Sequence, residues 1–283
     1  MNSFLFVTHL TPENKSSSIR KSLFNLHEKA IFNQTYSNWK VFQVGEEEFR
    51  DEKIFRVRLD NSKSKDEQKK LLYEIFSRED VKEYFEKSDY IIKLDDDDVI
   101  SPILLEHLAD FNLDLYCDEF HFFYDLCTGM ISSQKRNWIA STCVHRTEHA
   151  LTKVNPSGPP NIFFNSLLYT NHSITWHEFY KNKNYLTASA HHPVYMRVLS
   201  PTSISSGVRS NLLLSSDDID FICYGNYLRG FGSWVHFSKN DFSCYQEELI
   251  RIWENFPKGR NRMNINLQEK LGLANRLRKL FKF

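Results

Sequence analysis

Four consecutive aspartates, Asp95–Asp98, are the residues whose type and spacing most clearly indicate chemistry. They directly follow the apolar run 90–94, whose length and β-branched content predict a buried strand. Four adjacent carboxylates repel one another at neutral pH, and a hard cation such as Mg²⁺ or Mn²⁺ relieves this repulsion by binding their oxygen atoms. Open α/β sheets bind ligands at the carboxyl ends of their strands. The pattern therefore predicts a metal or ligand site, with a solvated acidic turn as the alternative.

Strands and helices alternate in the part of the chain that leads to these aspartates. The predicted strands are 4–7, 39–44, 54–59 and 90–94, and the predicted helices are 19–31, 64–76 and 81–85. Strands that alternate with helices imply a parallel sheet with right-handed crossovers. We therefore predict an α/β fold with a mostly parallel sheet and flanking helices, whose strand ends would position the aspartates.

The sequence after Asp98 changes character, first to aromatic strand-like runs and then to a helical pattern. The predicted strands are 113–117, 120–126, 137–144 and 192–198, and the predicted helices are 174–180, 217–228, 244–254 and 267–283. The loop 155–160 is the most proline-rich segment of the chain. We predict an α/β domain over residues 1–210 and a helical C-terminal extension over residues 211–283.

Composition excludes several classes of function. The 283 residues carry 36 basic and 36 acidic side chains, a balance that argues against nucleic-acid binding. Five widely spaced cysteines form no CxxC pair, which disfavours structural zinc and indicates a reducing, cytoplasmic compartment. No signal peptide and no run of about 18 apolar residues is visible. The absence of a glycine-rich loop disfavours a Walker-type or dinucleotide-binding site.

Two separated segments carry a resemblance to a known family. The segment 33–44, with Gln34-Thr35-Tyr36-Ser37-Asn38-Trp39, resembles the turn before the second strand in family 2 glycosyltransferases. The segment 94–102, Leu-Asp-Asp-Asp-Asp-Val-Ile-Ser-Pro, resembles their Asp-x-Asp motif and that of a bacterial group described as rhamnosyltransferases. A weaker match is 193–198 followed by 203–205. Together the matches extend over about residues 1–207.

The resemblance implies a GT-A (Rossmann-like) fold, a nucleotide-sugar donor and a divalent cation, Mn²⁺ or Mg²⁺. In this family the cation bridges the two phosphates of the donor and neutralises the charge that develops on the leaving nucleoside diphosphate. Asp96 and Asp98 are the expected metal ligands, while Asp95 or Asp97 would contact the ribose or the sugar. A shift of this register by one residue stays open. His192, of the pair 191–192, is a further candidate metal ligand.

Two more positions correspond to donor-binding positions of the family. Glu46 and Glu47 lie where the family has an aspartate pair that helps to hold the nucleoside, and a solvated charged loop is the alternative. Thr8, at the end of the first strand, is expected to approach the base.

The expected catalytic base departs from the family pattern. Inverting members use a carboxylate to deprotonate the acceptor hydroxyl. In the corresponding segment 171–178 that carboxylate pair is missing and His172 takes the place of the aspartate, with Glu178 as the second candidate. A histidine has a suitable pKa for this task, although it could equally have a structural role. Asp218 is a third candidate, although Asp217 and Asp218 also suit a helix N-terminus. The resemblance favours inversion.

The C-terminal segment 267–283 combines five basic residues with apolar residues at helical spacing. Such a helix could lie on the inner face of the cell membrane as a peripheral contact, or it could pack on the protein itself. Membrane contact would suit a glycan or lipid-linked saccharide acceptor in bacterial surface polysaccharide synthesis. The rival functions are a metal-dependent nucleotidyltransferase and a non-catalytic sugar- or metal-binding protein of the same fold.

Overall fold

The main sheet is built from the apolar runs of the N-terminal half and from later strands. The computed structural model describes residues 1–13, 16–118, 120–126, 130–135, 143–151, 180–188, 194–200, 235–236 and 242–255. The eight strands have the spatial order β11-β7-β10-β5-β1-β2-β4-β3. Their bounds are β1 Phe4–His9, β2 Trp39–Gly45, β3 Phe49–Arg50, β4 Ile54–Arg58, β5 Tyr90–Lys93, β7 Leu115–Asp118, β10 Cys143–Arg146 and β11 Tyr185–Ala188.

The central strands of this sheet are parallel. β1 pairs in parallel with β2 and β5, and β2 pairs in parallel with β4. β10 is antiparallel to both of its neighbours, β5 and β7, while the short β3 is antiparallel to β4. The predicted α/β class with a mostly parallel sheet is therefore confirmed, with β10 as the reversed strand that the sequence pattern did not predict. Only the last two residues of the predicted strand 137–144 belong to it; the rest lie outside the described residues.

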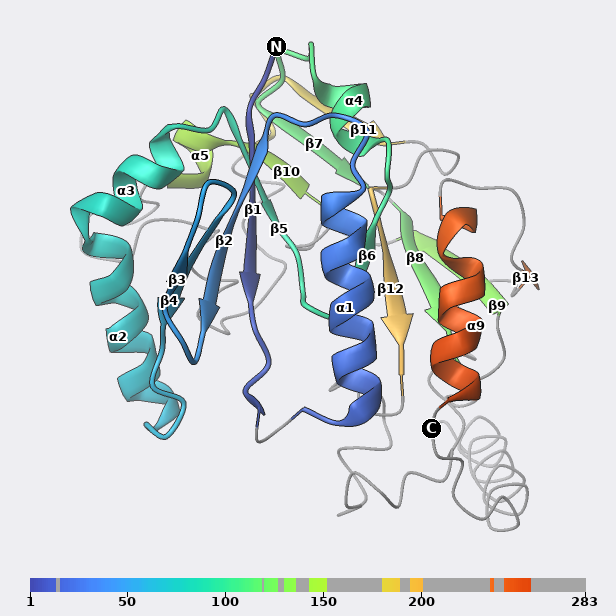
Figure 1. Ribbon diagram of the computed structural model, residues 1–283. Helices are drawn as coiled ribbons and strands as arrows, with labels where there is room; N and C mark the ends of the chain where they lie inside the picture. Colours follow the sequence, from blue (N-terminus) through green and yellow to red (C-terminus); the bar gives the residue numbers. More distant parts are fainter. Residues whose placement is uncertain are drawn as a thin grey trace, which may run out of the picture.

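Helices cover both faces of the sheet because side chains of a strand alternate between its faces. Phe4 and Phe6 of β1 pack with α1 (Ser18–Phe32), whereas Leu5 and Val7 pack in a second core with α2, α3 and α5. Figure 1 shows α2 and α3 away from α1. The helix starts agree with their sequence signals, since Ser17 caps α1 and Ser64 forms a capping box on α2. The remaining bounds are α2 Lys65–Ser77, α3 Glu79–Glu86, α4 Leu104–Leu108 and α5 Thr147–Leu151.

A second sheet extends the core on the α1 side. Its strand order is β13-β9-β8-β12-β6, and its bounds are β6 Val99–Ile100, β8 Phe120–Asp125, β9 Met130–Lys135, β12 Tyr195–Leu199 and β13 Val235–His236. The aspartates occupy the connection between β5 of the first sheet and β6 of the second. The fold thus holds this connection at both ends by strands of different sheets.

The helix α9 (Gln246–Glu254), with the preceding turn Ser243–Tyr245, packs on this same core rather than away from it. Leu249 is fully buried in the core that contains α1, and the Tyr245 hydroxyl donates to the carbonyl oxygen of Ile100 at 3.1 Å. Lys29 of α1 pairs with Glu248, and Figure 1 shows α1 and α9 side by side. The domain boundary after residue 210 stays a prediction, because residues 201–234 lie outside the described part.

Several predicted elements lie outside the described residues: the helices 217–228 and 267–283 and nearly all of 174–180. Among the described helices, none has the length and apolar character of a membrane span.

Candidate functional site

The loop between β5 and β6, which we call the aspartate loop (Leu94–Asp98), is largely buried. Asp96, Asp97 and Asp98 are only 3%, 8% and 2% exposed, while 44% of the Asp95 side chain is exposed. Carboxylates are rarely buried unless charged or hydrogen-bonding groups accompany them. The burial excludes the solvated acidic turn, and it makes Asp95 the carboxylate of this loop that most directly faces solvent.

Asp96 joins the aspartate loop to the segment between β1 and α1. It accepts hydrogen bonds from the Thr11 backbone amide at 2.6 Å and from the Thr11 hydroxyl at 3.1 Å. Arg20, in the first turn of α1, donates to Asp96 Oδ1 at 2.5 Å through one terminal nitrogen, and its other terminal nitrogen donates to Asp97 Oδ2. One guanidinium therefore bridges two neighbouring carboxylates. Such charge-assisted bonds are stronger than bonds between neutral groups.

Asp98 joins the loop to the second sheet and to α1. Its Oδ1 accepts from the Val198 amide of β12 at 3.1 Å. The buried His27 ring lies 3.0 Å from the Asp98 carbonyl oxygen and 3.4 Å from the Thr8 hydroxyl. Because a carbonyl oxygen only accepts, Nδ1 of His27 carries the proton and Nε2 accepts from Thr8. Burial lowers the pKa of His27, so the ring acts here as a neutral link.

Three basic side chains compensate the charge of the aspartate loop. Arg20 contacts Asp96 and Asp97, and Lys93 contacts Asp95. Arg197 of β12 lies close enough to Asp98 that its positive charge opposes, without cancelling, the rise in the pKa of Asp98. The pKa of Asp97 is nevertheless raised to about 6, because burial and the neighbouring aspartates outweigh Arg20 and Arg197. Burial likewise raises the pKa of Asp98 well above its usual range. The basic side chains and the raised pKa values therefore already relieve the repulsion among the carboxylates. Contrary to the expectation from the sequence, this repulsion alone does not require a metal ion.

The donor atoms still fit a divalent cation in their chemistry. Carboxylate oxygens are the ligands that Mg²⁺ and Mn²⁺ prefer. Asp96 accepts three hydrogen bonds from protein groups, and Asp98 accepts one from a buried backbone amide. Their role as metal ligands stays a prediction. Asp95 has the most exposed side chain of the four and contacts Lys93, and Asp97 contacts Arg20.

The other residues predicted from the sequence lie in different surroundings. Thr8 is fully buried against His27, and Glu46 is exposed and accepts from the Glu13 amide at 2.8 Å. Their donor-binding roles stay predictions. Four further predicted residues, His172, Glu178, His192 and Asp218, lie outside the described residues. The membrane segment 267–283 lies outside them too.

Sequence reasoning missed Arg20, Thr11, His27 and Lys93. One signal for Arg20 was available: it lies in the first turn of the helix that follows β1, and β1 is parallel to β5, so both strands end at the same edge. The partners of Asp96 and Asp97 had no signal in the sequence, because they depend on how the β1–α1 segment turns.

The segments that carry the family resemblance meet in the structure. The Gln34 side chain donates to the Ser101 carbonyl oxygen at 2.8 Å, and the Thr35 amide donates to the Pro102 carbonyl oxygen at 3.1 Å. The weaker third match joins them, since β12 pairs with β6 and the Ser101 amide donates to the Val194 carbonyl oxygen at 3.1 Å. The first segment and the described part of the third, residues 194–198, therefore both contact the segment 99–102 that directly follows the aspartate loop. Residues 193 and 203–205 of the third match lie outside the described residues.

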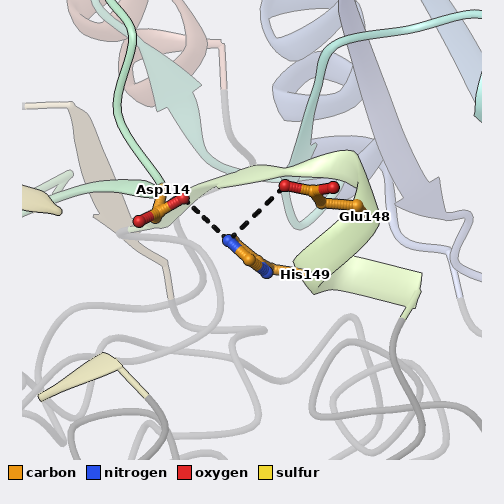
Figure 2. Close-up of side chains that lie close together, drawn as sticks. All are labelled: Asp114, Glu148 and His149. Atoms are coloured by element: carbon orange, nitrogen blue, oxygen red, sulfur yellow. Dashed lines mark hydrogen bonds and ion pairs between the residues drawn. The ribbon is translucent and has the colours of Figure 1, made fainter. Parts of the chain in front are cut away.

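A second cluster of possible metal-ligating groups lies at the other end of the β5 strand, where β5 begins. Figure 2 shows Asp114, Glu148 and His149, whose ligand atoms lie within 4.8 Å of one another. His149 Nε2 lies 2.8 Å from Asp114 Oδ1 and 3.8 Å from Glu148 Oε1. The Asn184 amide donates to Asp114 Oδ2 at 2.8 Å, and Arg146 Nε lies 3.8 Å from Oδ1.

This second cluster is best explained as a set of structural ion pairs. Burial raises the pKa of Asp114, but the hydrogen bonds from His149 and the Asn184 amide outweigh it and hold that pKa below its usual range. The positive charge of Arg146 already neutralises the same carboxylate. Asp114 thereby connects the start of β7 to α5 and to the segment before β11.

The raised pKa of Asp97 predicts a pH-dependent effect of Asp97→Asn. A folded-state pKa of about 6 against an ordinary value of 3.8 means that the folded protein binds this proton more tightly than the unfolded chain. The carboxyl's contribution to stability is therefore present at low pH and is lost as pH rises through about 6. Asparagine does not titrate. The free energy of unfolding of Asp97→Asn, relative to that of wild type, should therefore fall by about 1 kcal/mol from pH 7 to pH 5. Urea unfolding at both pH values measures this, and a difference that is independent of pH would contradict it.

Comparison with known proteins gives matches among solved structures alone. No protein-family model and no curated protein sequence matches the chain. The match to the crystal structure of S. aureus TarS covers 70% of this chain and 37% of the TarS chain, with a TM-score of 0.40 and 11% identity. The match to S. aureus TarS 1-349 in complex with UDP-GlcNAc covers 89% of this chain and 72% of that one, with a TM-score of 0.40 and 10% identity. The match to the glycosyltransferase GlyE from Streptococcus pneumoniae TIGR4 covers 70% of this chain and 54% of the GlyE chain, with a TM-score of 0.34 and 9% identity.

Proposed function

We propose that the protein is a glycosyltransferase of the GT-A type, which transfers a sugar from a nucleotide-sugar donor to a glycan or lipid-linked saccharide. The observation that carries this proposal is the contact, beside the aspartate loop, among the described parts of the three motif segments. Gln34 and Thr35 bond to Ser101 and Pro102 across 67 residues of sequence. A chance likeness between short separate segments gives no reason for them to be in contact. The carboxyl end of β5 is also where open α/β sheets bind ligands.

In this proposal the four carboxylates of the aspartate loop have two different roles. Asp95 and Asp97 would hold a divalent cation, Mn²⁺ or Mg²⁺, which corresponds to the register shifted by one residue from Asp96 and Asp98. Such an ion supplies charge neutralisation for the diphosphate that leaves the sugar. Asp96 fixes the loop to Thr11 and Arg20, and Asp98 fixes it to β12. The two framework aspartates keep the two ligand aspartates in place before any ligand arrives, which is the condition for effective electrostatic catalysis.

Further parts of the proposal concern residues outside the described part. His172 is the proposed base that deprotonates the acceptor hydroxyl of an inverting reaction, with Glu178 and Asp218 as alternatives. The segment 267–283 is the proposed peripheral membrane contact for a lipid-linked acceptor in bacterial surface polysaccharide synthesis.

A donor-hydrolysis assay tests the proposed function against both rivals. The protein is incubated with Mn²⁺ and a panel of nucleotide sugars, and the release of nucleoside diphosphate is measured. A glycosyltransferase should release diphosphate slowly from one donor and faster when acceptor is present. A parallel incubation contains a nucleoside triphosphate and a sugar phosphate in place of the nucleotide sugars. Release of pyrophosphate there would instead identify a nucleotidyltransferase. A protein that binds the donor and releases nothing would be a non-catalytic binder.

A further inference from the structure

Arg20 supplies a positive charge of the protein itself to two carboxylates of the aspartate loop. Its two terminal nitrogens reach two different carboxylates, Asp96 and Asp97, and only 14% of its side chain is exposed. Burial by itself would lower the pKa of Arg20, but the aspartates outweigh it and raise that pKa, so the guanidinium stays charged. A permanent positive charge therefore contacts Asp97, one of the two carboxylates that would hold the divalent cation.

The start of α1 and the segment before it position Arg20 beside the aspartate loop. Ser17 caps α1 by accepting from the Arg20 backbone amide at 3.3 Å, which fixes the start of the helix. Thr11, in the segment that precedes α1, bonds to the same Asp96 through its amide and its hydroxyl. The guanidinium is thus presented to the loop from the capped first turn of α1.

We propose that Arg20 is a built-in counter-cation that competes with the divalent ion for Asp97 and so sets the metal affinity of the aspartate loop. This inference rests on the proposed function, since it assumes that the loop receives a divalent ion. Arg20 is a positioning residue in this account, because it acts on the ligand through the carboxylates that it contacts. A positive charge within contact distance of a ligand carboxylate weakens the binding of a second cation there. Removal of that charge should therefore strengthen metal binding.

A purely structural role for Arg20 predicts the opposite sign. If the guanidinium served only to hold the loop in shape, its loss would leave the aspartates disordered and the metal affinity would fall. The direction of the change in metal affinity therefore separates the two roles, and it does not depend on any activity measurement.

The test is a titration of the full chain with Mn²⁺ alone, in which free Mn²⁺ is measured by its paramagnetic resonance signal. Arg20→Gln is expected to bind Mn²⁺ at least about tenfold more tightly than wild type. Lys21→Gln is the matched control, because Lys21 is the next residue of the same helix, is exposed and pairs with Glu13 at 3.3 Å. It removes the same charge without touching the aspartate loop and should change the affinity less than about twofold.

A second variant keeps the test decisive if Arg20→Gln does not fold. Arg20→Lys retains the charge but presents a single ammonium that cannot bridge two carboxylates as a planar guanidinium does. It should bind Mn²⁺ about threefold more tightly than wild type. Unchanged or weaker Mn²⁺ binding by the folded variants would overturn the inference, and so would the absence of Mn²⁺ binding to wild type and variants alike. Stronger Mn²⁺ binding without any nucleotide-sugar turnover would retain the role of Arg20 and reject the transferase.

Discussion

Replacement of Asp95 by asparagine is expected to lower the release of nucleoside diphosphate from the donor at least about 100-fold. Asp95 is the carboxylate of the aspartate loop with the most exposed side chain, so it is the one best placed to meet a ligand. Asparagine keeps an oxygen that can accept from the buried Lys93 ammonium but loses the negative charge. The free energy of unfolding should therefore change by only about 1 kcal/mol.

The control for this experiment is Asp110→Asn, since Asp110 is an exposed aspartate in a different part of the fold. It should keep both wild-type turnover and wild-type stability. Turnover in Asp95→Asn within a few fold of wild type would show that the exposed carboxylate takes no part in the reaction. A large loss of stability would mean that Asp95 serves the fold.

Replacement of Asp98 by alanine is expected to have the largest effect on stability among the four aspartates, about 2–4 kcal/mol. The Asp98 side chain is buried and accepts from the Val198 amide at 3.1 Å. Alanine would leave that buried amide without its acceptor. It would also remove the carboxylate that most strongly raises the pKa of the half-buried Arg197. A buried polar group and a half-buried charge that lose their partners are both costly.

Asparagine at position 98 should cost less than half as much as alanine. Its amide oxygen can still accept from Val198, and burial already favours the neutral form of the Asp98 carboxyl by raising its pKa. Urea unfolding of wild type and both variants at pH 7 measures the difference. Equal losses for alanine and asparagine would show that the negative charge, rather than the hydrogen bond, is what the fold requires.

The elements of the N-terminal half could be predicted because their signals are local. The apolar runs at β1, β2 and β5 correspond to buried strands, and the run at β4 to a strand that is buried at alternate residues. Ser17 and Ser64 mark the starts of α1 and α2. Alternation of strands and helices then predicts parallel pairing. The reversed strand β10 and the division into two sheets had no comparable signal, because they depend on pairings between residues far apart in the chain.

The candidate site could be located from the sequence, but its electrostatics could not be predicted. Asp95–Asp98 form one uninterrupted motif at a strand end, which is enough to place the loop. Arg20 and Arg197 come from segments about 75 and 100 residues away in the chain, and only the fold brings them to the aspartates. Repulsion among carboxylates was therefore overestimated by an argument that considered the motif alone. The greater exposure of the Asp95 side chain likewise follows only from the fold.

The most direct test of the account is a calorimetric titration of wild type, Asp95→Asn and Asp110→Asn with a panel of nucleoside diphosphates, with and without Mn²⁺. The account predicts that one nucleoside diphosphate binds wild type and Asp110→Asn in the presence of Mn²⁺, and that Asp95→Asn loses this binding. Failure of every nucleoside diphosphate to bind under any condition would contradict the donor site. Equal binding by wild type and Asp95→Asn would contradict its location at the aspartate loop.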